Sequence, residues 1–277
     1  GELTIDRLGG PEVIPIGEQP AAVQSGVVDM GALYGSRVGG IIPAFQFFLM
    51  SRYHIGQNHE VGFYKWVNDK GMKDGVMFLG MLVDEIDSNS FMYISKRIPR
   101  PEKSSDLKGL IMGTYGAMKP WVEGLGMTYQ SVPGAERYTA IERGVTDGTV
   151  VSLESGVGYS LPEVCSWFIN HGAYGANQTL VINKDVFEGL PPHLQDLMKE
   201  GMAWVEENAE AWQQARLAEV FAYFEEGGME IVEFSEAEKE KFLAPAYEAK
   251  WDDAYDKWPR EAMEAHAILV EGLPYRP

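Results

Sequence analysis

The alternation of apolar and polar positions divides the chain into two parts. Before residue 184, short apolar segments alternate with amphipathic ones, a pattern that predicts strands alternating with helices. From Pro191 onward the pattern is helical, and residues 194–226 keep the helical period until Gly227 and Gly228 end it. We therefore predict an α/β protein with a mostly parallel sheet, followed by long helices.

The boundaries of these elements follow from the glycines, prolines and turn residues between them. The predicted strands are residues 3–8, 27–34, 76–83, 91–94, 110–113, 128–132, 149–153 and 230–234. The predicted helices are residues 17–25, 60–70, 117–125, 135–143 and 194–226, and one that begins at Ser235, where Ser235 and Glu238 match a capping box.

One helix-to-strand junction occurs twice in the sequence. Residues 22–29 and 140–147 align without a gap, with Ala, an aliphatic residue, Gly, Val and Asp in register. In both copies the glycine, Gly26 or Gly144, stands where a helix ends and a positive φ is needed. The repeat favours two similar α/β lobes, and the simpler alternative is that many such junctions look alike.

The balance of charges excludes one class of partner. The chain has 277 residues, enough for two modest domains or one large one, and its 41 acidic and 23 basic residues give a net charge of −18. Such a surface repels phosphate backbones, so we expect no nucleic-acid partner. The same surface suits a saline medium.

The sequence gives few signs of compartment. Cys165 is its only cysteine, so no intramolecular disulfide can form, and its apolar neighbours predict a buried thiol. The apolar run at residues 39–50 is too short for a membrane span. No signal peptide is present, and because the chain opens directly on a predicted strand, we expect that a preceding segment has been removed.

No catalytic or metal-binding motif stands out. The spacing of His54 and His59 is compatible with a pair of zinc ligands, and the carboxylates at residues 84–87 are compatible with a cation site. For both groups, a solvated surface position is the simpler interpretation. The sequence contains no nucleophile elbow, no Cys–His pairing and no glycine-rich phosphate loop. We therefore predict no catalytic residue, no metal and no cofactor.

Aromatic residues follow several predicted strands. In open α/β sheets, ligands bind beyond the carboxyl ends of the strands, where aromatic side chains can line a pocket. Ordinary core packing is the alternative for each of them. These residues are Tyr34, Phe91, Tyr93, Tyr115, Trp121, Trp167 and Tyr174.

Short motifs stand in a characteristic order along the chain. They are A-V-x-x-G-V-V-D-M at residues 22–30, D-L-K-G at 106–109, G-M-x-Y-x-x-V-P at 126–133 and A-I-x-x-G-V-T-D-G at 140–148. Asn170-His171 and L-P-P-H-L-Q at residues 190–195 continue the series. Together they resemble the DctP-type solute-binding proteins of tripartite ATP-independent periplasmic (TRAP) transporters, over nearly the whole chain.

The resemblance implies an α/β, two-lobed periplasmic-binding-protein-like fold with hinge strands and a long lobe-spanning helix. Residues 1–95 would form mainly lobe 1, without the family's first strand and helix, and residues 96–185 mainly lobe 2. Residues 186–277 would form the long helix and the C-terminal helices that pack across both lobes. The resemblance also implies a periplasmic protein, not an enzyme, that delivers a small-molecule ligand to the membrane subunits of a TRAP permease.

The sequence departs from the family at the ligand site. Family members usually carry an arginine in the strand after D-L-K-G, and Gly113 stands at that place, so the bidentate clamp for a carboxylate is missing. Carboxylates and aromatic rings at strand ends favour a cationic amine or amino alcohol, ethanolamine-like or choline-like. The predicted ligand contacts are Glu12, Tyr34, Phe91, Gly113, Tyr115, Ser152, Glu154, Trp167, Asn170 and Tyr174.

Three alternatives stay open. In the first alternative, another arginine, such as Arg37 or Arg97, holds a carboxylate ligand in place of the missing clamp. In the second alternative, the two-lobed scaffold belongs to an enzyme, a lyase or an isomerase. The third alternative is a structural or signalling protein with a vestigial ligand site.

Overall fold

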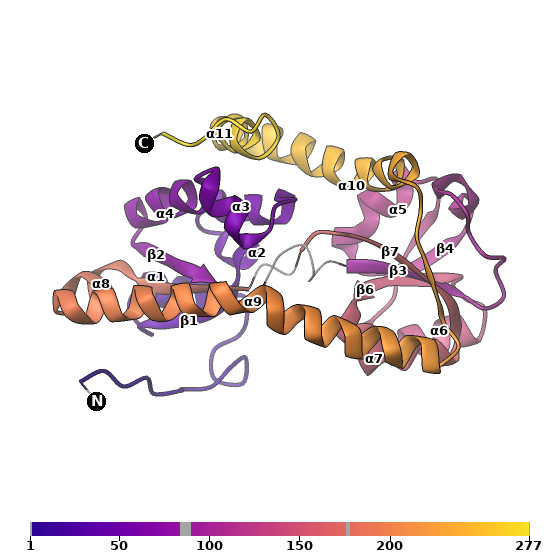
Figure 1. Cartoon of the computed structure of the whole chain (residues 1–277), viewed down its shortest axis with the longest axis horizontal. Coiled ribbons are helices and arrows are strands. Elements are labelled where there is room, and N and C mark those ends of the chain that lie inside the picture. Colours follow the sequence, from indigo (N-terminus) through magenta and orange to yellow (C-terminus); the bar gives the residue numbers. More distant parts are fainter. Residues whose placement is uncertain (1, 84–89, 176–177, 277) are drawn as a thin grey trace. The chain divides into compact units, whose positions relative to one another are not determined.

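The computed structural model describes residues 2–83, 90–175 and 178–276. The chain folds into two compact units, each assembled from separate parts of the sequence (Figure 1). The first unit comprises residues 1–85, 176–213 and 258–277, and the second comprises residues 86–175 and 214–257. The chain therefore passes between the units four times, whereas the ranges predicted from the sequence are continuous segments.

The first unit is built on a three-stranded sheet in the order β1-β8-β2. The central strand β8 (Gln178–Asn183) is antiparallel to both β1 (Met30–Tyr34) and β2 (Val76–Met81). In its core, the ring of Phe48 lies 5.3 Å from the rings of both Phe63 and Phe78. The helices of this unit include α1 (Gln19–Gln24), α2 (Gly35–Val38), η1 (Pro43–Met50), α3 (Ile55–Glu60), α4 (Phe63–Lys73), α8 (Lys184–Gly189) and α11 (Pro259–Leu269).

The second unit contains a six-stranded sheet in the order β5-β4-β6-β3-β7-β9. The prediction of a mostly parallel sheet is confirmed in this unit, where β5, β4, β6, β7 and β9 run in one direction and β3 opposes them. It is wrong for the first unit, where β8 is antiparallel to both of its neighbours. β4 is parallel to β5 and β6, but β3 is antiparallel to β6 and β7, and side chains alternate in the same way along strands of either direction. The strands are β3 (Ser90–Ser95), β4 (Ile111–Thr114), β5 (Thr128–Ser131), β6 (Gly148–Ser152), β7 (Cys165–Ala173) and β9 (Glu230–Val232).

Short helices connect these strands, and one longer helix packs beside them. The N–H and the hydroxyl of Ser104, in the first short helix, both donate to the carboxylate of Glu238. Glu238 is the residue predicted to form a capping box with Ser235. The helices are η3 (Ser104–Leu107), η4 (Gly116–Met118), α5 (Lys119–Gly124), η5 (Gly134–Glu136), α6 (Arg137–Glu142), α7 (Leu153–Gly158), η6 (Leu161–Glu163) and α10 (Glu236–Lys257).

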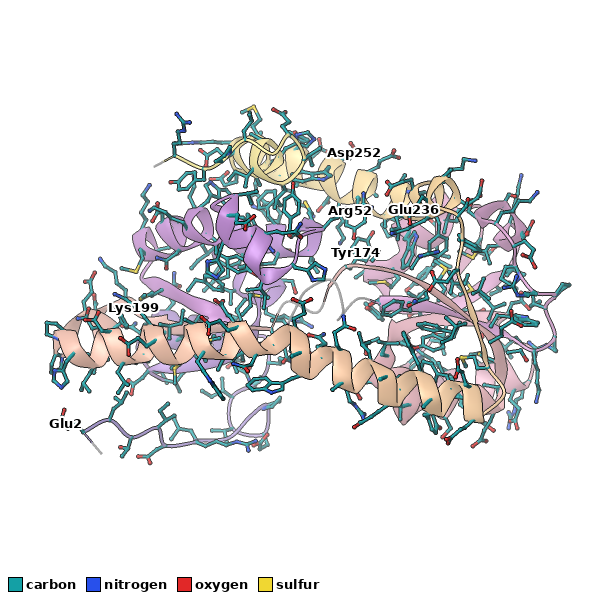
Figure 2. The ribbon with its side chains drawn as sticks, viewed as in Figure 1. Glu2, Arg52, Tyr174, Lys199, Glu236 and Asp252 are labelled. Carbon is teal, nitrogen blue, oxygen red and sulfur yellow. The ribbon has the colours of Figure 1, made fainter. Side chains whose placement is uncertain are left out.

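The long helix predicted at residues 194–226 is confirmed as α9 (Pro192–Glu226). Its residues up to 213 belong to the first unit and the rest to the second. In the second unit, Phe224 is fully buried and packs against Tyr93 and Phe168, at ring-centroid distances of 5.7 and 5.4 Å. Charged residues such as Lys199 on α9 and Asp252 on α10 are exposed (Figure 2).

Two local predictions are wrong. Residues 3–8 form no strand, because they find no ladder partner in the part of the chain that the structure describes, and Ile5 and Leu8 are exposed. The helix predicted at residues 60–70 is interrupted at Gly62, whose φ of 76° separates α3 from α4. A left-handed residue cannot continue a right-handed helix.

The repeated junction is confirmed in its backbone. Gly26 and Gly144 have φ angles of 74° and 73°, and the N–H of each donates 3.1 Å to the carbonyl three residues earlier. A strand follows in both cases, β1 after Gly26 and β6 after Gly144. Each unit therefore contains one copy of the same helix–glycine–strand junction.

Candidate functional site

The carboxyl ends of three strands meet at one edge of the sheet in the second unit. β4, β5 and β6 are parallel and adjacent, so Tyr115, Val132 and Ser152 stand where these strands end. β3 is antiparallel, and its first residue, Ser90, pairs with Ser152. The hydroxyls of Ser90 and Tyr115 are hydrogen-bonded at 3.1 Å. We call this the carboxyl edge, and it is where open α/β sheets bind ligands.

Arg137, the first residue of α6, is a buried cation at the carboxyl edge. Its side chain is 6% exposed, its Nε donates 3.2 Å to the carbonyl of Val132, and its guanidinium lies 5.4 Å from the ring centroid of Tyr115. Burial lowers the pKa of Arg137, and the hydroxyls of Tyr159, Tyr115 and Tyr129 oppose this shift. Among the described residues, no carboxylate pairs with Arg137 and its two terminal nitrogens have no hydrogen-bond partner.

Gly113 in β4 stands where the family resemblance predicts an arginine, and the space around it is closed. A Cβ atom at position 113 would lie 2.9 Å from Cγ2 of Thr146 and 3.0 Å from Cγ2 of Val132. The hydroxyl of Thr146 is buried and has no hydrogen-bond partner among the described residues. Neighbouring side chains have therefore taken the place of a side chain at position 113.

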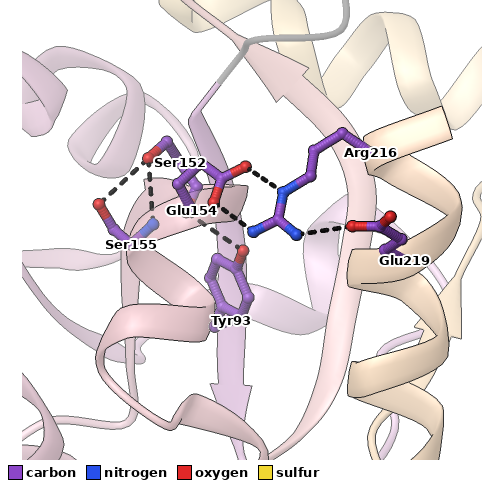
Figure 3. A network of polar contacts seen from close by, with 6 residues as sticks. All are labelled: Tyr93, Ser152, Glu154, Ser155, Arg216 and Glu219. Atoms are coloured by element: carbon purple, nitrogen blue, oxygen red, sulfur yellow. Dashed lines mark hydrogen bonds and ion pairs between the residues drawn. The ribbon is translucent and has the colours of Figure 1, made fainter. Parts of the chain in front are cut away.

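Glu154, predicted to anchor an amine, is already neutralised. Its two oxygens accept hydrogen bonds from Nε and Nη2 of Arg216, both at 2.9 Å, and Nη1 of Arg216 bonds Glu219 at 2.9 Å (Figure 3). The hydrogen bonds from Arg216 lower the pKa of Glu154. The predicted contact Ser152 caps α7, its hydroxyl accepting from the N–H of Ser155 at 3.4 Å.

Two predicted aromatic contacts lie near the carboxyl edge but are buried. Phe91 follows Ser90 in β3 and is part of the hydrophobic core. Tyr174 follows β7, whose last residue pairs with Ser90. The hydroxyl of Tyr174 donates 2.7 Å to the carbonyl of Ala246, and Nζ of Lys250 lies 5.3 Å from its ring centroid. Burial raises the pKa of this hydroxyl.

Two other predicted contacts lie away from this edge. Trp167 pairs with Ile94, near the beginning of β6, and its indole N–H donates 2.8 Å to the carbonyl of Ile98. Asn170 lies in the middle of β7, and its amide donates to the carboxylate of Glu233 at 2.5 Å. The structure does not bring these two side chains together with Tyr115 and Ser152.

The remaining predicted contacts belong to the first unit. Glu12 lies in an exposed loop, where its carboxylate accepts a 2.7 Å bond from the N–H of Gly10. Backbone hydrogen bonds lower its pKa. Tyr34 ends β1 and is 41% exposed. The roles of Glu12 and Tyr34 as ligand contacts stay predictions.

The two arginines considered as alternative clamps have other surroundings. Arg37 is exposed on α2 of the first unit. The guanidinium of Arg97 bonds the carbonyls of Ile141 and Thr146, at 2.5 and 3.0 Å, and so fastens the end of α6. Sequence reasoning missed Arg137, although it stands four residues before the buried Ile141 and therefore on the same face of the helix.

A shallow hollow of about 420 Å³ lies beside α6. Arg137 does not line it, so we treat it separately from the carboxyl edge. Its lining residues are Gly134, Ala135, Tyr138, Gly158, Tyr159, Ser160 and Glu163.

Metal ligands do not gather in the described residues. No group of three or more His, Cys, Asp or Glu side chains there has a metal-binding arrangement. His59 bonds the carboxylate of Glu206 at 2.8 Å. The carboxylates at residues 84–87 lie outside the described residues. In the described part of the chain, no helix combines the length and apolar character needed to cross a membrane.

Comparison with known proteins gives consistent results. Residues 13–257 match the model of the DctP family, bacterial extracellular solute-binding protein family 7. A solute-binding protein of Albidiferax ferrireducens is 23% identical over 265 residues, which cover 91% of this chain and 76% of the relative.

Two solved structures of TRAP periplasmic solute-binding proteins have the same fold. One, from Sulfitobacter sp. NAS-14.1 with bound β-D-galacturonate, has a TM-score of 0.69 and 19% identity, over 92% of this chain and 84% of that one. The other, from Rhodoferax ferrireducens with bound malonate, has a TM-score of 0.67 and 22% identity, over 92% and 83%. The family match spans most of the sequence, and the chain belongs to the DctP family of bacterial extracellular solute-binding proteins.

Proposed function

We propose that this protein captures a small carboxylate solute in the periplasm and delivers it to the membrane subunits of a TRAP permease. The family match supports a solute-binding role outside the cytoplasm. The sequence alone favoured an amine ligand, because Gly113 has replaced the usual arginine and carboxylates follow the strands. The contacts of those carboxylates favour an acid instead.

The observation that carries this choice is the ion pair between Glu154 and Arg216. An ammonium ligand needs a carboxylate that is not yet paired, and both oxygens of Glu154 already accept bonds from Arg216. The other candidate, Glu12, is exposed in a loop of the first unit, where water solvates it well. Neither residue offers the buried anion that would bind an ammonium group strongly.

The ligands of structural relatives agree with an acid. The Rhodoferax protein holds malonate and the Sulfitobacter protein holds β-D-galacturonate, and both ligands are carboxylates. These proteins share at most 22% identity with this chain, so they support the class of ligand and not its identity.

A panel of ligands tests the proposal. We expect malonate, β-D-galacturonate or a related acid to raise the Tm of the protein and to bind in calorimetry, while ethanolamine and choline do not. Sodium chloride at matched ionic strength is the control for non-specific salt effects. Stabilisation by the amines alone would contradict the proposal. NMR of the released solute should show it unchanged, and a converted product would instead indicate an enzyme.

A further inference from the structure

We propose that Arg137 is the anchor of the ligand carboxylate, in place of the side chain missing at position 113. The inference rests on the proposed function, because it requires an acidic ligand. It assigns the anchor to the helix α6, whereas the resemblance in sequence predicts it on the strand that here is β4.

The first argument is the unbalanced charge of Arg137. A buried cation is costly unless an anion or several acceptors compensate it. Arg137 has one hydrogen bond, from Nε to the carbonyl of Val132, and the face of the Tyr115 ring. Among the described residues no carboxylate compensates its charge, so a carboxylate from outside the chain would be the missing partner.

The second argument is the geometry of the guanidinium group. The bond from Nε and the contact with Tyr115 hold the group in one orientation and leave both terminal nitrogens without a partner among the described residues. Two such nitrogens match the two oxygens of a carboxylate in a bidentate pair. Because the group is already ordered, little side-chain entropy is lost on binding.

The third argument is position. Arg137 bonds the residue that directly follows β5 and contacts the residue that directly follows β4, so it lies at the carboxyl edge. Ligands of open α/β sheets bind at this edge. The hydroxyls of Ser90 and Tyr115, bonded to each other there, are further polar groups for a small solute.

The fourth argument links Arg137 to Gly113. Val132 accepts the Nε bond of Arg137, and its Cγ2 occupies the space that a Cβ at position 113 would need. The side chains that close this space therefore also hold Arg137. An arginine at position 113 would have to displace Val132 and Thr146, so the two anchors exclude each other in this packing.

Three of the four other arginines of the second unit are already bonded, and the fourth, Arg143, is exposed. Arg97 donates to two backbone carbonyls, Arg100 to Glu102 and Glu230, and Arg216 to Glu154 and Glu219. Binding a ligand carboxylate there would mean breaking one of these contacts. Arg137 needs no such exchange.

Affinity for matched pairs of acid and neutral analogue tests the assignment. The probes are β-D-galacturonate against galactose and malonate against malonamide, with wild type, Arg137→Gln, Arg137→Lys and Arg143→Gln. We expect Arg137→Gln to lose acid affinity by on the order of 100-fold and to lose the preference for acid over neutral analogue. Arg137→Lys should recover part of both, because it restores the charge without the fork.

Arg143→Gln is the matched control, since Arg143 is exposed at the other end of α6. It should bind as wild type does. A merely structural Arg137 would lower the Tm of the ligand-free protein on substitution and leave the acid preference intact, and that result would overturn the assignment. If wild type prefers acids and Arg137→Gln prefers them equally, the assignment fails while the proposed function stands. If wild type binds no acid, the proposed function fails, and the assignment with it.

Discussion

Arg216 donates one hydrogen bond to each carboxylate oxygen of Glu154, both at 2.9 Å. The pair joins α9 to α7 within the second unit (Figure 3). It decides which ligand class Glu154 can serve, because a carboxylate that is paired on both oxygens offers no strong site for a cation. It also makes a prediction about stability that needs no ligand.

Glu154→Gln should lower the free energy of unfolding at pH 7 by about 0.5–1 kcal/mol, the upper part of the range for an exposed ion pair, because the pair is bidentate but solvent screens its charges. The pKa of Glu154 is lowered by Arg216 from its ordinary value of 4.5. This stabilisation is therefore complete above pH 4.5 and is lost as the pH falls through the lowered pKa. Urea denaturation of both proteins at pH 7 and at about pH 3.5 measures it, and an equal difference at both pH values would contradict the assignment.

The sequence predicted the fold well where a local pattern carries the information. The apolar residues of α9 roughly follow the helical period. Gly26 and Gly144 are of the residue type that a positive φ requires. The antiparallel strands β3 and β8 were not predictable, because an antiparallel strand shows the same side-chain alternation as a parallel one. Residues 3–8 alternate like a strand, but a strand also needs a partner, which no local pattern reveals.

The candidate site was predictable only in part. Tyr115, Ser152 and Glu154, all predicted contacts, lie at or just after the ends of β4 and β6, at one edge of the sheet, and their roles as ligand contacts stay predictions. The partner of Glu154 is Arg216, which comes from α9 and lies 62 residues away in sequence. Arg137 was not among the predicted site residues, because a charged residue on a short helix is normally expected at the surface. Its burial depends on tertiary packing around Val132.

A substitution at the repeated junction tests the backbone argument. Gly144→Ala should lower the free energy of unfolding by about 1 kcal/mol, because alanine is strained at positive φ. The nearest atom to the new Cβ would be Cζ of Arg97 at 3.5 Å, an ordinary contact, so the loss should come from backbone conformation and not from a clash. Urea denaturation is the measurement.

Gly201→Ala is the matched control for this effect. Gly201 lies inside α9, and a Cβ atom there meets nothing within 4 Å. Alanine is the better helix former, so this substitution should raise the free energy of unfolding by up to about 1 kcal/mol. Opposite signs for the two Gly→Ala changes are the expected result, and equal losses would contradict the conformational explanation.

His171 should make stability depend on pH near neutrality. It is 6% exposed, and its Nε2 accepts a 2.7 Å hydrogen bond from the N–H of Phe234. Burial lowers the pKa of His171 from its ordinary value of 6.5. The unfolded chain therefore binds the proton more readily, and the stabilisation is complete above pH 6.5 and lost as the pH falls through the lowered pKa.

Urea denaturation between about pH 5 and pH 7.5 checks this expectation. Wild type should lose stability toward the acidic end, and His171→Gln, whose amide oxygen can still accept from Phe234, should lose less. His193→Gln is the control, because the side chain of His193 is 64% exposed. A pH dependence of His171→Gln equal to that of wild type would rule out His171 as its source.

Substitution of Glu264 in α11 should destabilise the protein. The indole N–H of Trp66, which is fully buried in α4, donates 2.8 Å to Oε2 of Glu264, and Nζ of Lys70 lies 2.5 Å from the same oxygen. Glu264→Ala leaves the buried indole N–H without an acceptor, so it should lower the free energy of unfolding by about 1–3 kcal/mol. Denaturation of the variant in urea, followed by tryptophan fluorescence, measures the loss.

Glu264→Gln separates the hydrogen bond from the charge. Its amide oxygen can still accept from Trp66 but no longer pairs with Lys70, so the loss should be clearly smaller than for Glu264→Ala. Arg260→Ala serves as the control, since the side chain of Arg260 is 79% exposed and donates to Oε1, the other oxygen of Glu264. It should change stability by less than about 0.5 kcal/mol. If Glu264→Ala proves as stable as Glu264→Gln, the bond to Trp66 contributes nothing, and the attachment of α11 to α4 depends on apolar packing alone.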